Sequence, residues 1–210
     1  MESYVKALEE AILQYVGLPV LNCLKADPTN ALKLSRQLVD ATMLFMDLRS
    51  FPQSSKNVLP DKLLDYLNIY FGKMSEIIIR YNGFVDSLRG DGIFAVFGIS
   101  NNHHADDACN AAIECLRSLD EFNMSVGIGI NSGKVILGNI GSKYKLKFTV
   151  VGDNVNLAAR MESETAKYQC PILLTEYTKQ LLTMEFNIKE LERISVKGLE
   201  GQLMVYSLQA

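Results

Sequence analysis

Apolar residues along the chain fall into short continuous runs and into stripes with a helical period. Ala41–Met46 is almost wholly apolar, as expected of a strand that is covered on both faces of a sheet. Between Leu63 and Tyr81, apolar side chains recur every three or four positions, which predicts a helix of about five turns. Two further apolar runs, Phe84–Leu88 and Ile93–Phe97, are joined by Arg-Gly-Asp-Gly, a turn that is typical of a hairpin.

The second half of the chain continues the alternation. The pattern predicts a helix at Asp106–Leu119, then strands at Met124–Ile130 and Lys134–Leu137 that are separated by Asn-Ser-Gly. Next we expect a basic loop at 143–147, a strand at 147–151 and a helix that begins near Asp153. After these we expect a strand at 172–174, a short helix from 175 onward, and two final strands at 188–196 and 203–208. The order strand, helix, strand, strand, helix, strand predicts an α+β fold of the ferredoxin-like, split βαβ kind: a βαββαβ palm with extra C-terminal strands.

The first 24 residues differ from the rest. Their apolar positions have spacings of three, four and three, which begin a heptad stripe at Val5, Leu8, Ile12 and Tyr15. Gly17 and Pro19 interrupt this stripe, and residues 25–30 are predicted to be a connector. The stripe fits either an amphipathic helix lying on the domain or a helix that pairs with its twin in a dimer. We divide the chain into an N-terminal helix and connector, 1–40, a candidate transducer or dimerisation segment, and one catalytic domain, 41–210.

Composition excludes several classes of protein. The 210 residues are 48% hydrophobic and 21% charged, which is ordinary for a globular domain, and a net charge of −3 argues against a nucleic-acid partner. The four cysteines form no Cys-x-x-Cys pair, so we expect reduced thiols and a cytoplasmic location. No apolar run approaches the roughly 18 residues of a membrane span, and no secretory signal begins the chain.

Two aspartates are candidates for a metal site. Asp47 ends the apolar strand at 41–46, and Asp91 lies in the turn of the predicted hairpin. Either one alone is an ordinary turn residue, but in a split βαβ sheet the two would emerge at the same edge. Converging carboxylates suit Mg²⁺ or Mn²⁺, and two such ions about 4 Å apart can clamp a phosphate during in-line displacement. Residues 48–53 are expected to begin a short helix whose free N–H groups suit a triphosphate.

A second candidate group follows the strand at 147–151. Asp153 fits the N-cap of a helix. Asn156 and Arg160 are four positions apart and therefore share one face of that helix. Because their neighbours are apolar or small, we expect that face to be partly enclosed, where both polar side chains need partners.

These motifs occur in a specific order: Phe-Met-Asp47-Leu-Arg-Ser-Phe, then Gly-Asp91-Gly, then Thr149-Val-Val-Gly-Asp-Asn-Val-Asn-Leu-Ala-Ala-Arg160. From about Ala41 to Tyr206 the chain resembles the class III adenylate and guanylate cyclases, most of all the bacterial-type adenylate cyclases. The resemblance implies conversion of ATP to 3′,5′-cyclic AMP and pyrophosphate with two Mg²⁺ or Mn²⁺ ions per site. It also implies a head-to-tail homodimer with shared sites, and an upstream sensor domain in the full-length protein.

The resemblance also implies a role for individual residues. Asp47 and Asp91, with Leu48 beside the first, match the metal-binding set, and Asn156 and Arg160 match the pair that orients the ribose and stabilises charge on the reacting phosphate. The remaining matches contact the phosphates or the base: Lys197 and Lys145 (or Lys143) for phosphate, and Thr149 and Ser87 for base selection.

Ser87 departs from the family pattern. Adenine-using members typically have Lys at this position and guanine-using members Glu, whereas serine is too short to reach as either would. The choice of adenine therefore rests on Thr149. Two alternatives stay open: a guanylate cyclase acting on GTP, and a degenerate cyclase-like module that binds nucleotide without turnover. A diguanylate cyclase is disfavoured because its Gly-Gly-Asp/Glu-Glu-Phe hairpin is absent.

Overall fold

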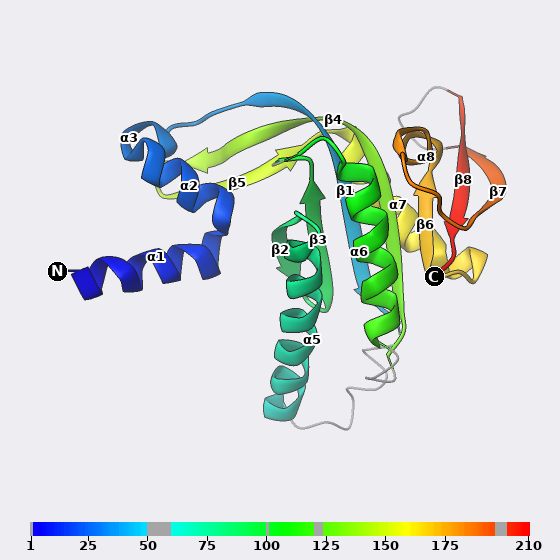
Figure 1. The fold of residues 1–210 in the computed structure, drawn as a ribbon, viewed down its shortest axis with the longest axis horizontal. Helices are drawn as coiled ribbons and strands as arrows, with labels where there is room; N and C mark the ends of the chain where they lie inside the picture. Colours follow the sequence, from blue (N-terminus) through cyan, green and yellow to red (C-terminus); the bar gives the residue numbers. More distant parts are fainter. Residues whose placement is uncertain (1, 50–59, 100, 120–123, 196–200) are drawn as a thin grey trace.

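A computed structural model describes residues 2–49, 60–99, 101–119, 124–195 and 201–210 (Figure 1). Within these described residues, the first elements are α1 (Glu2–Val16), α2 (Leu18–Ala26), α3 (Pro28–Ala31), β1 (Gln37–Leu48), α5 (Pro60–Arg80), β2 (Phe84–Arg89), β3 (Gly92–Phe97) and α6 (His104–Leu119). They are followed by β4 (Val126–Ser142), β5 (Lys145–Val151), α7 (Asp153–Tyr168), β6 (Ile172–Thr175), α8 (Glu176–Leu181), β7 (Ile188–Ser195) and β8 (Gln202–Leu208).

One mixed sheet organises the domain. Its strand order is β2-β3-β1-β4-β6-β8-β7, and β5 pairs with β4 outside this path. The centre is the long antiparallel pair of β1 and β4, whose register runs from Gln37 opposite Leu137 to Leu48 opposite Val126. The pairing of β1 with β4 also completes the βαββαβ order, so the predicted α+β palm is confirmed, and β6, which pairs parallel with β4, is the first extra C-terminal strand on this path.

Helices cover both faces of the sheet, which explains why β1 is apolar from Ala41 to Met46 apart from Thr42. One face packs against α5 and α6, where Leu44, Met46 and Met74 are buried in the same cluster. The other face packs against α7, where Met43 and Ala158 are buried. Adjacent residues of β1 thus enter different cores, as the alternation of side chains along a strand requires.

Three sequence-based predictions about element bounds were wrong. Residues 131–133 do not separate two strands, because β4 continues through them with Asn131 opposite Met43. The predicted basic loop at 143–147 is mostly strand, since β5 already begins at Lys145 opposite Ser142. The predicted connector at 25–30 is largely helical.

The helical connector has a local cause that the sequence contains. The carboxylate of Asp27 accepts hydrogen bonds from the backbone N–H groups of Thr29 and Asn30, each at 3.1 Å, and so caps α3. Pro28 at the first helical position has its φ already set for a helix. Aspartate followed by proline is therefore a helix start here and not a turn.

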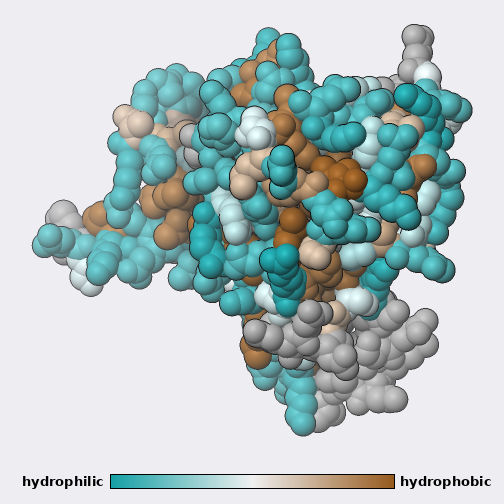
Figure 2. Space-filling model, turned by 45° about the vertical axis from the view of Figure 1, so that its right-hand side comes forward, coloured by the Kyte–Doolittle hydropathy of each residue, from teal (hydrophilic) through white to brown (hydrophobic). Residues whose placement is uncertain are grey.

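The N-terminal helices are largely exposed, and Leu21 of α2 is the one buried residue among their described residues. The predicted helix is present as α1, which ends before Gly17, a residue with φ of +92°. A Cβ atom at Gly17 would lie 2.6 Å from the ring of Phe84, so this break touches the edge strand β2. No residue of α1 is buried, and Figure 2 shows hydrophobic surface along these helices. Among the described residues, no helix is long and apolar enough to cross a membrane.

Candidate active site

The end of β1 and the turn between β2 and β3 bring Asp47 and Asp91 together. Met46 pairs with Ile93, so Asp47 lies beside the start of β3, and a Cβ atom at Gly92 would be 3.0 Å from its Oδ1. Burial raises the pKa of the Asp47 carboxyl, and the negative charge of Asp91 raises it further. The convergence that the topology predicted is therefore present.

The donors at this edge fit a hard divalent cation. In the described part of the chain, no cluster of three or more Asp, Glu, His or Cys side chains is close enough to hold a metal ion on its own. Mg²⁺ is usually bound by one or two carboxylates, and its remaining positions are taken by water and substrate phosphates. Asp47 and Asp91 supply the two carboxylates, and a phosphate would have to complete the shell.

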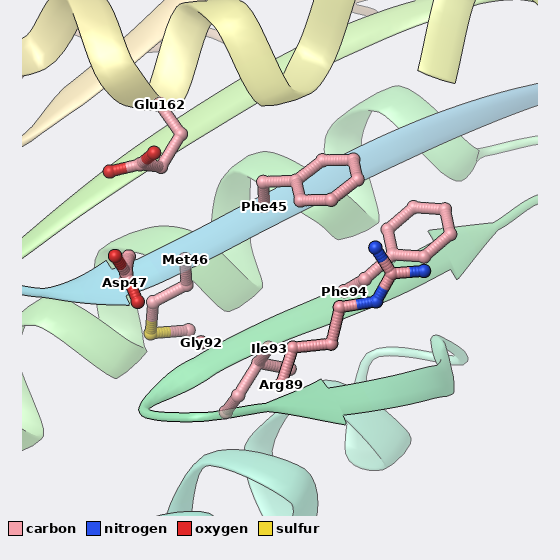
Figure 3. A pocket seen from close by; sticks show the side chains of 8 residues that line it. All are labelled: Phe45, Met46, Asp47, Arg89, Gly92, Ile93, Phe94 and Glu162. Carbon is pink, nitrogen blue, oxygen red and sulfur yellow. The ribbon is translucent and has the colours of Figure 1, made fainter. Parts of the chain in front are cut away.

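A pocket of about 180 Å³ opens beside Asp47 (Figure 3). Its walls come from β1, β2, β3 and α7, and its lining residues are Phe45, Met46, Asp47, Arg89, Gly92, Ile93, Phe94 and Glu162. The rings of Phe45 and Phe94 stack with centroids 4.4 Å apart and form an apolar wall. Arg89 contributes the positive charge on the same side of the pocket as Phe94 (Figure 3).

Sequence reasoning missed Glu162. Figure 3 shows its side chain reaching from α7 toward Asp47. Burial raises the pKa of the Glu162 carboxyl, and the nearby charge of Asp47 adds to the effect. The helix can approach so closely because Gly127 and Gly129 have no side chains; a Cβ atom at Gly127 would be 2.8 Å from Glu162 Oε1. Glycines at alternate positions of β4 were the signal available in the sequence.

The first turn of α7 departs from the sequence-based prediction. Gly152 occupies the N-cap position, with φ of +154°, and Asp153 is the first helical residue, so Asp153 is not the cap. An aspartate at the first turn still interacts favourably with the helix dipole. Asn156 is exposed, so the predicted enclosure is wrong for this residue within one chain.

Arg160 lies in an unusual environment for a surface arginine. Its side chain is 40% exposed and forms an ion pair with Glu164 at 3.7 Å, one helical turn further on. Its Nε atom is buried and has no hydrogen-bond partner among the described residues. This buried Nε is the atom that faces Glu164 Oε1, so an anion would have to bind the terminal N–H groups of the guanidinium.

A buried polar network fixes the start of α7. Asn131 of β4 donates from Nδ2 to the backbone carbonyl of Asn154 at 2.9 Å. Thr175 in turn donates to Asn131 Oδ1 at 2.7 Å. This explains why Asn131 and Ser132 can lie inside a strand that is buried on both faces: their polar atoms are satisfied by hydrogen bonds.

The predicted base-selecting residues lie away from the Asp47 pocket. Thr149 pairs with Gly138 in the arm formed by β4 and β5, and the Oγ atom of Ser87 is buried on β2 without a hydrogen-bond partner in the described chain. Neither residue lines the pocket, nor do Asn156 and Arg160. One chain therefore brings Asp47 and Asp91 together but does not add the other predicted residues to their pocket.

The predicted phosphate-binding lysines have different outcomes. Lys143 and Lys145 are exposed around the tip of the β4–β5 arm, and Lys143 Nζ lies 4.9 Å from the centre of the Tyr144 ring. Neither lines the pocket. Lys197 lies outside the described residues. Of the short helix predicted at 48–53, only Leu48 and Arg49 are described: Leu48 ends β1, and Arg49 follows it.

The fold and this arrangement agree with comparisons with known proteins. Residues 35–210 match the family model of the adenylate and guanylate cyclase catalytic domain. The chain therefore belongs to this family, as the sequence motifs predicted.

Individual relatives point the same way. The chain is 35% identical over 179 residues to the terminal-differentiation specific adenylate cyclase of Dictyostelium discoideum, covering 80% of this chain but only 8% of that protein. The crystal structure of the adenylyl cyclase CyaB of P. aeruginosa aligns with a TM-score of 0.77 and 26% identity, over 84% of this chain and 97% of that chain. A guanylyl cyclase structure aligns with a TM-score of 0.74 and 31% identity, over 83% of this chain and 93% of that chain.

Proposed function

We propose that this chain is the catalytic domain of an adenylate cyclase, which converts ATP to 3′,5′-cyclic AMP and pyrophosphate. The observation that carries the proposal is the convergence of Asp47 and Asp91 at the edge of the sheet, in a domain of the cyclase family. The reaction is attack of the ribose 3′-hydroxyl on the α-phosphorus, with pyrophosphate as the leaving group.

The proposed cofactors are two Mg²⁺ or Mn²⁺ ions per site, held by Asp47 and Asp91 next to Leu48. Such ions activate an attacking hydroxyl and neutralise phosphate charge. The chain's own residues supply the remaining functions. Asn156 orients the ribose, and Arg160 donates hydrogen bonds to the negative charge that develops on the reacting phosphate.

We further propose a head-to-tail homodimer in which each site takes its aspartates from one chain and its Asn156 and Arg160 from the other. The incomplete pocket beside Asp47 supports this, as does the partly exposed side chain of Arg160, which does not line that pocket. The exposed apolar residues of β1, β4 and β5, which include Leu38, Ile136 and Val151, offer surface for the contact. Two equivalent sites per dimer follow from twofold symmetry.

The wider setting of the domain is also a proposal. The chain spans a small part of the Dictyostelium cyclase, so a full-length protein with an upstream sensor is expected, with α1 to α3 as the joining segment. The four free thiols favour the cytoplasm.

The test is a product assay on the purified chain with Mn²⁺ or Mg²⁺ and equal concentrations of ATP and GTP, with cyclic products resolved by mass. We expect cyclic AMP as the main product. Cyclic GMP as the main product would favour the guanylate cyclase alternative, which Ser87 motivates. No cyclic product from a confirmed dimer would favour the degenerate, nucleotide-binding module.

A further inference from the structure

A charged pair joins strands β2 and β5 close to both predicted base-selecting residues. Lys147 Nζ lies 2.5 Å from Asp86 Oδ1, although the two residues are 61 positions apart in the chain. Asp86 directly precedes Ser87, and Lys147 is two positions before Thr149. Since side chains two apart on a strand share a face, Lys147 and Thr149 project from β5 on the same side.

A bulge in β2 accounts for the unusual position of Asp86. Val85 pairs with Ala95 and Ser87 with Phe94, so Asp86 is an additional residue with no partner on β3. A bulge breaks the strict alternation of side chains and redirects the extra residue. Asp86 and its neighbour Ser87 consequently both have buried side-chain oxygens, where a regular strand would turn one of them to the opposite face.

The two members of the pair differ sharply in exposure. The side chain of Asp86 is fully buried, whereas that of Lys147 is 41% exposed. Asp86 Oδ2 and Ser87 Oγ are also buried, and neither has a hydrogen-bond partner among the described residues. The buried carboxylate of Asp86 therefore fixes one end of the pair, and the Lys147 side chain remains partly accessible to a ligand.

We propose that Lys147, held in place by Asp86, is the residue that reads the purine base, and that it supplies the positive charge that Ser87 cannot. This inference rests on the proposed nucleotide cyclase function. The Lys147 ammonium has three N–H donors. One remains on Asp86, and another donates to the acceptor on the base edge, the ring nitrogen N1 of adenine. Asp86 is a positioning residue, because its buried carboxylate reaches the ligand only through Lys147. The hydroxyl of Thr149 lies on the same side of β5 and accepts from the adjacent amino group.

The test compares the equilibrium affinity for two nucleotides that cannot react. The ligands are 3′-deoxy-ATP and its 1-deaza analogue, which lacks the acceptor nitrogen; both lack the attacking hydroxyl. Affinities are measured by displacement of a fluorescent nucleotide in the presence of Mn²⁺. We expect the wild-type chain to bind 3′-deoxy-ATP about tenfold or more tightly than the analogue, as a hydrogen bond from a charged donor predicts.

Substitution of the pair should remove this preference. Lys147→Met should bring the affinity ratio of the two ligands to within about threefold of unity, while Lys147→Arg keeps a preference. Asp86→Asn should give an intermediate ratio, because the ammonium is no longer held. The double variant Asp86→Asn/Lys147→Met leaves no buried unpaired charge and should match Lys147→Met. Lys189→Met is the control: it removes an equal charge at an exposed position of β7 and should keep the wild-type ratio.

The ratio is insensitive to the fraction of protein that is folded, because both ligands are measured on one sample. An unchanged ratio in both Lys147→Met and the double variant would overturn the inference, as would a wild-type chain that binds the two ligands equally. Turnover of ATP is measured separately. A chain without turnover whose binding ratio still depends on Lys147 would refute the proposed activity but would support the role of Lys147 in binding the base.

Discussion

The Asp47 edge and the Asp86 region differ in how a buried carboxylate is balanced. Burial raises the pKa of Asp47, and the charge of a second carboxylate, Asp91, raises it further, so both oppose ionisation. Asp86 is more deeply buried but has a lysine ammonium at 2.5 Å. The first arrangement is unfavourable until a cation arrives from solution, whereas in the second the negative charge is already paired within the chain.

This difference separates two tasks within a single domain. Uncompensated carboxylates create a place for an exchangeable metal ion, because the ion relieves their repulsion on binding. A compensated pair presents a donor at a fixed place and needs no added ion. We therefore expect substitutions at the Asp47 edge to abolish chemistry and metal response, and substitutions at the Asp86 pair to change which base is bound.

The largest expected effect is loss of turnover on removal of one edge carboxylate. Asp47→Asn or Asp91→Asn should lower the rate of cyclic nucleotide formation by about a thousandfold or more, since metal stabilisation of phosphate charge contributes several kcal/mol. Asp61→Asn, the same change at an exposed position of α5, is the control. A rate within tenfold of wild type in Asp47→Asn would contradict the metal assignment.

The next effect concerns Arg160. Arg160→Ala should reduce kcat by about a hundredfold, as expected when a donor to developing charge is removed from a site. The exposed Arg117→Ala on α6 provides the control for loss of an arginine. Circular dichroism checks that the fold is retained. A changed KM with an unchanged kcat would contradict a role for Arg160 in the transition state.

A moderate effect is expected from the network that holds α7. Asn131→Ala removes the donor to the Asn154 carbonyl and the acceptor for Thr175, so it should lower the free energy of unfolding by about 1–3 kcal/mol. Urea denaturation measures this change, with exposed Asn187→Ala as the comparison. A loss below about 0.5 kcal/mol would mean that packing alone positions the helix.

The smallest effect is the response of stability to metal. Mn²⁺ at ten times its dissociation constant should stabilise the folded wild-type chain by about 1.4 kcal/mol, seen as a rise in Tm. Asp47→Asn should show little of this rise, and in a chelator its Tm should slightly exceed that of wild type because the repulsion with Asp91 is gone. An equal rise in both proteins would place the ion elsewhere.

The general fold was predictable because its signals are local. The apolar run at 41–46, the helical stripe ending near Tyr81 and the hairpin turn around Asp91 each depend on a few neighbouring residues. The topology of the split βαβ unit then brought Asp47 and Asp91 together without further information. The N-terminal break at Gly17 was predicted on similar grounds.

The errors arose where distant residues decide the outcome. Asn-Ser-Gly at 131–133 reads locally as a turn, but hydrogen bonds with Thr175 and Thr42 satisfy the polar side chains and keep β4 continuous. The pairing of Lys147 with Asp86 spans 61 positions and depends on a bulge, so no local pattern indicated it. The basic segment at 143–147 was expected to be a loop, but its second part pairs with β4, where Lys145 lies opposite Ser142.

The central claim, that each site combines residues of two chains, is tested most directly by mixing two inactive variants. Asp47→Asn and Arg160→Ala are combined in equal amounts under conditions that allow subunits to exchange, and heterodimers are counted by native mass spectrometry. Each heterodimer then contains one intact site, so we predict recovery of about a quarter of the wild-type activity. Activity that stays at the level of the separate variants, although heterodimers have formed, would contradict the shared site.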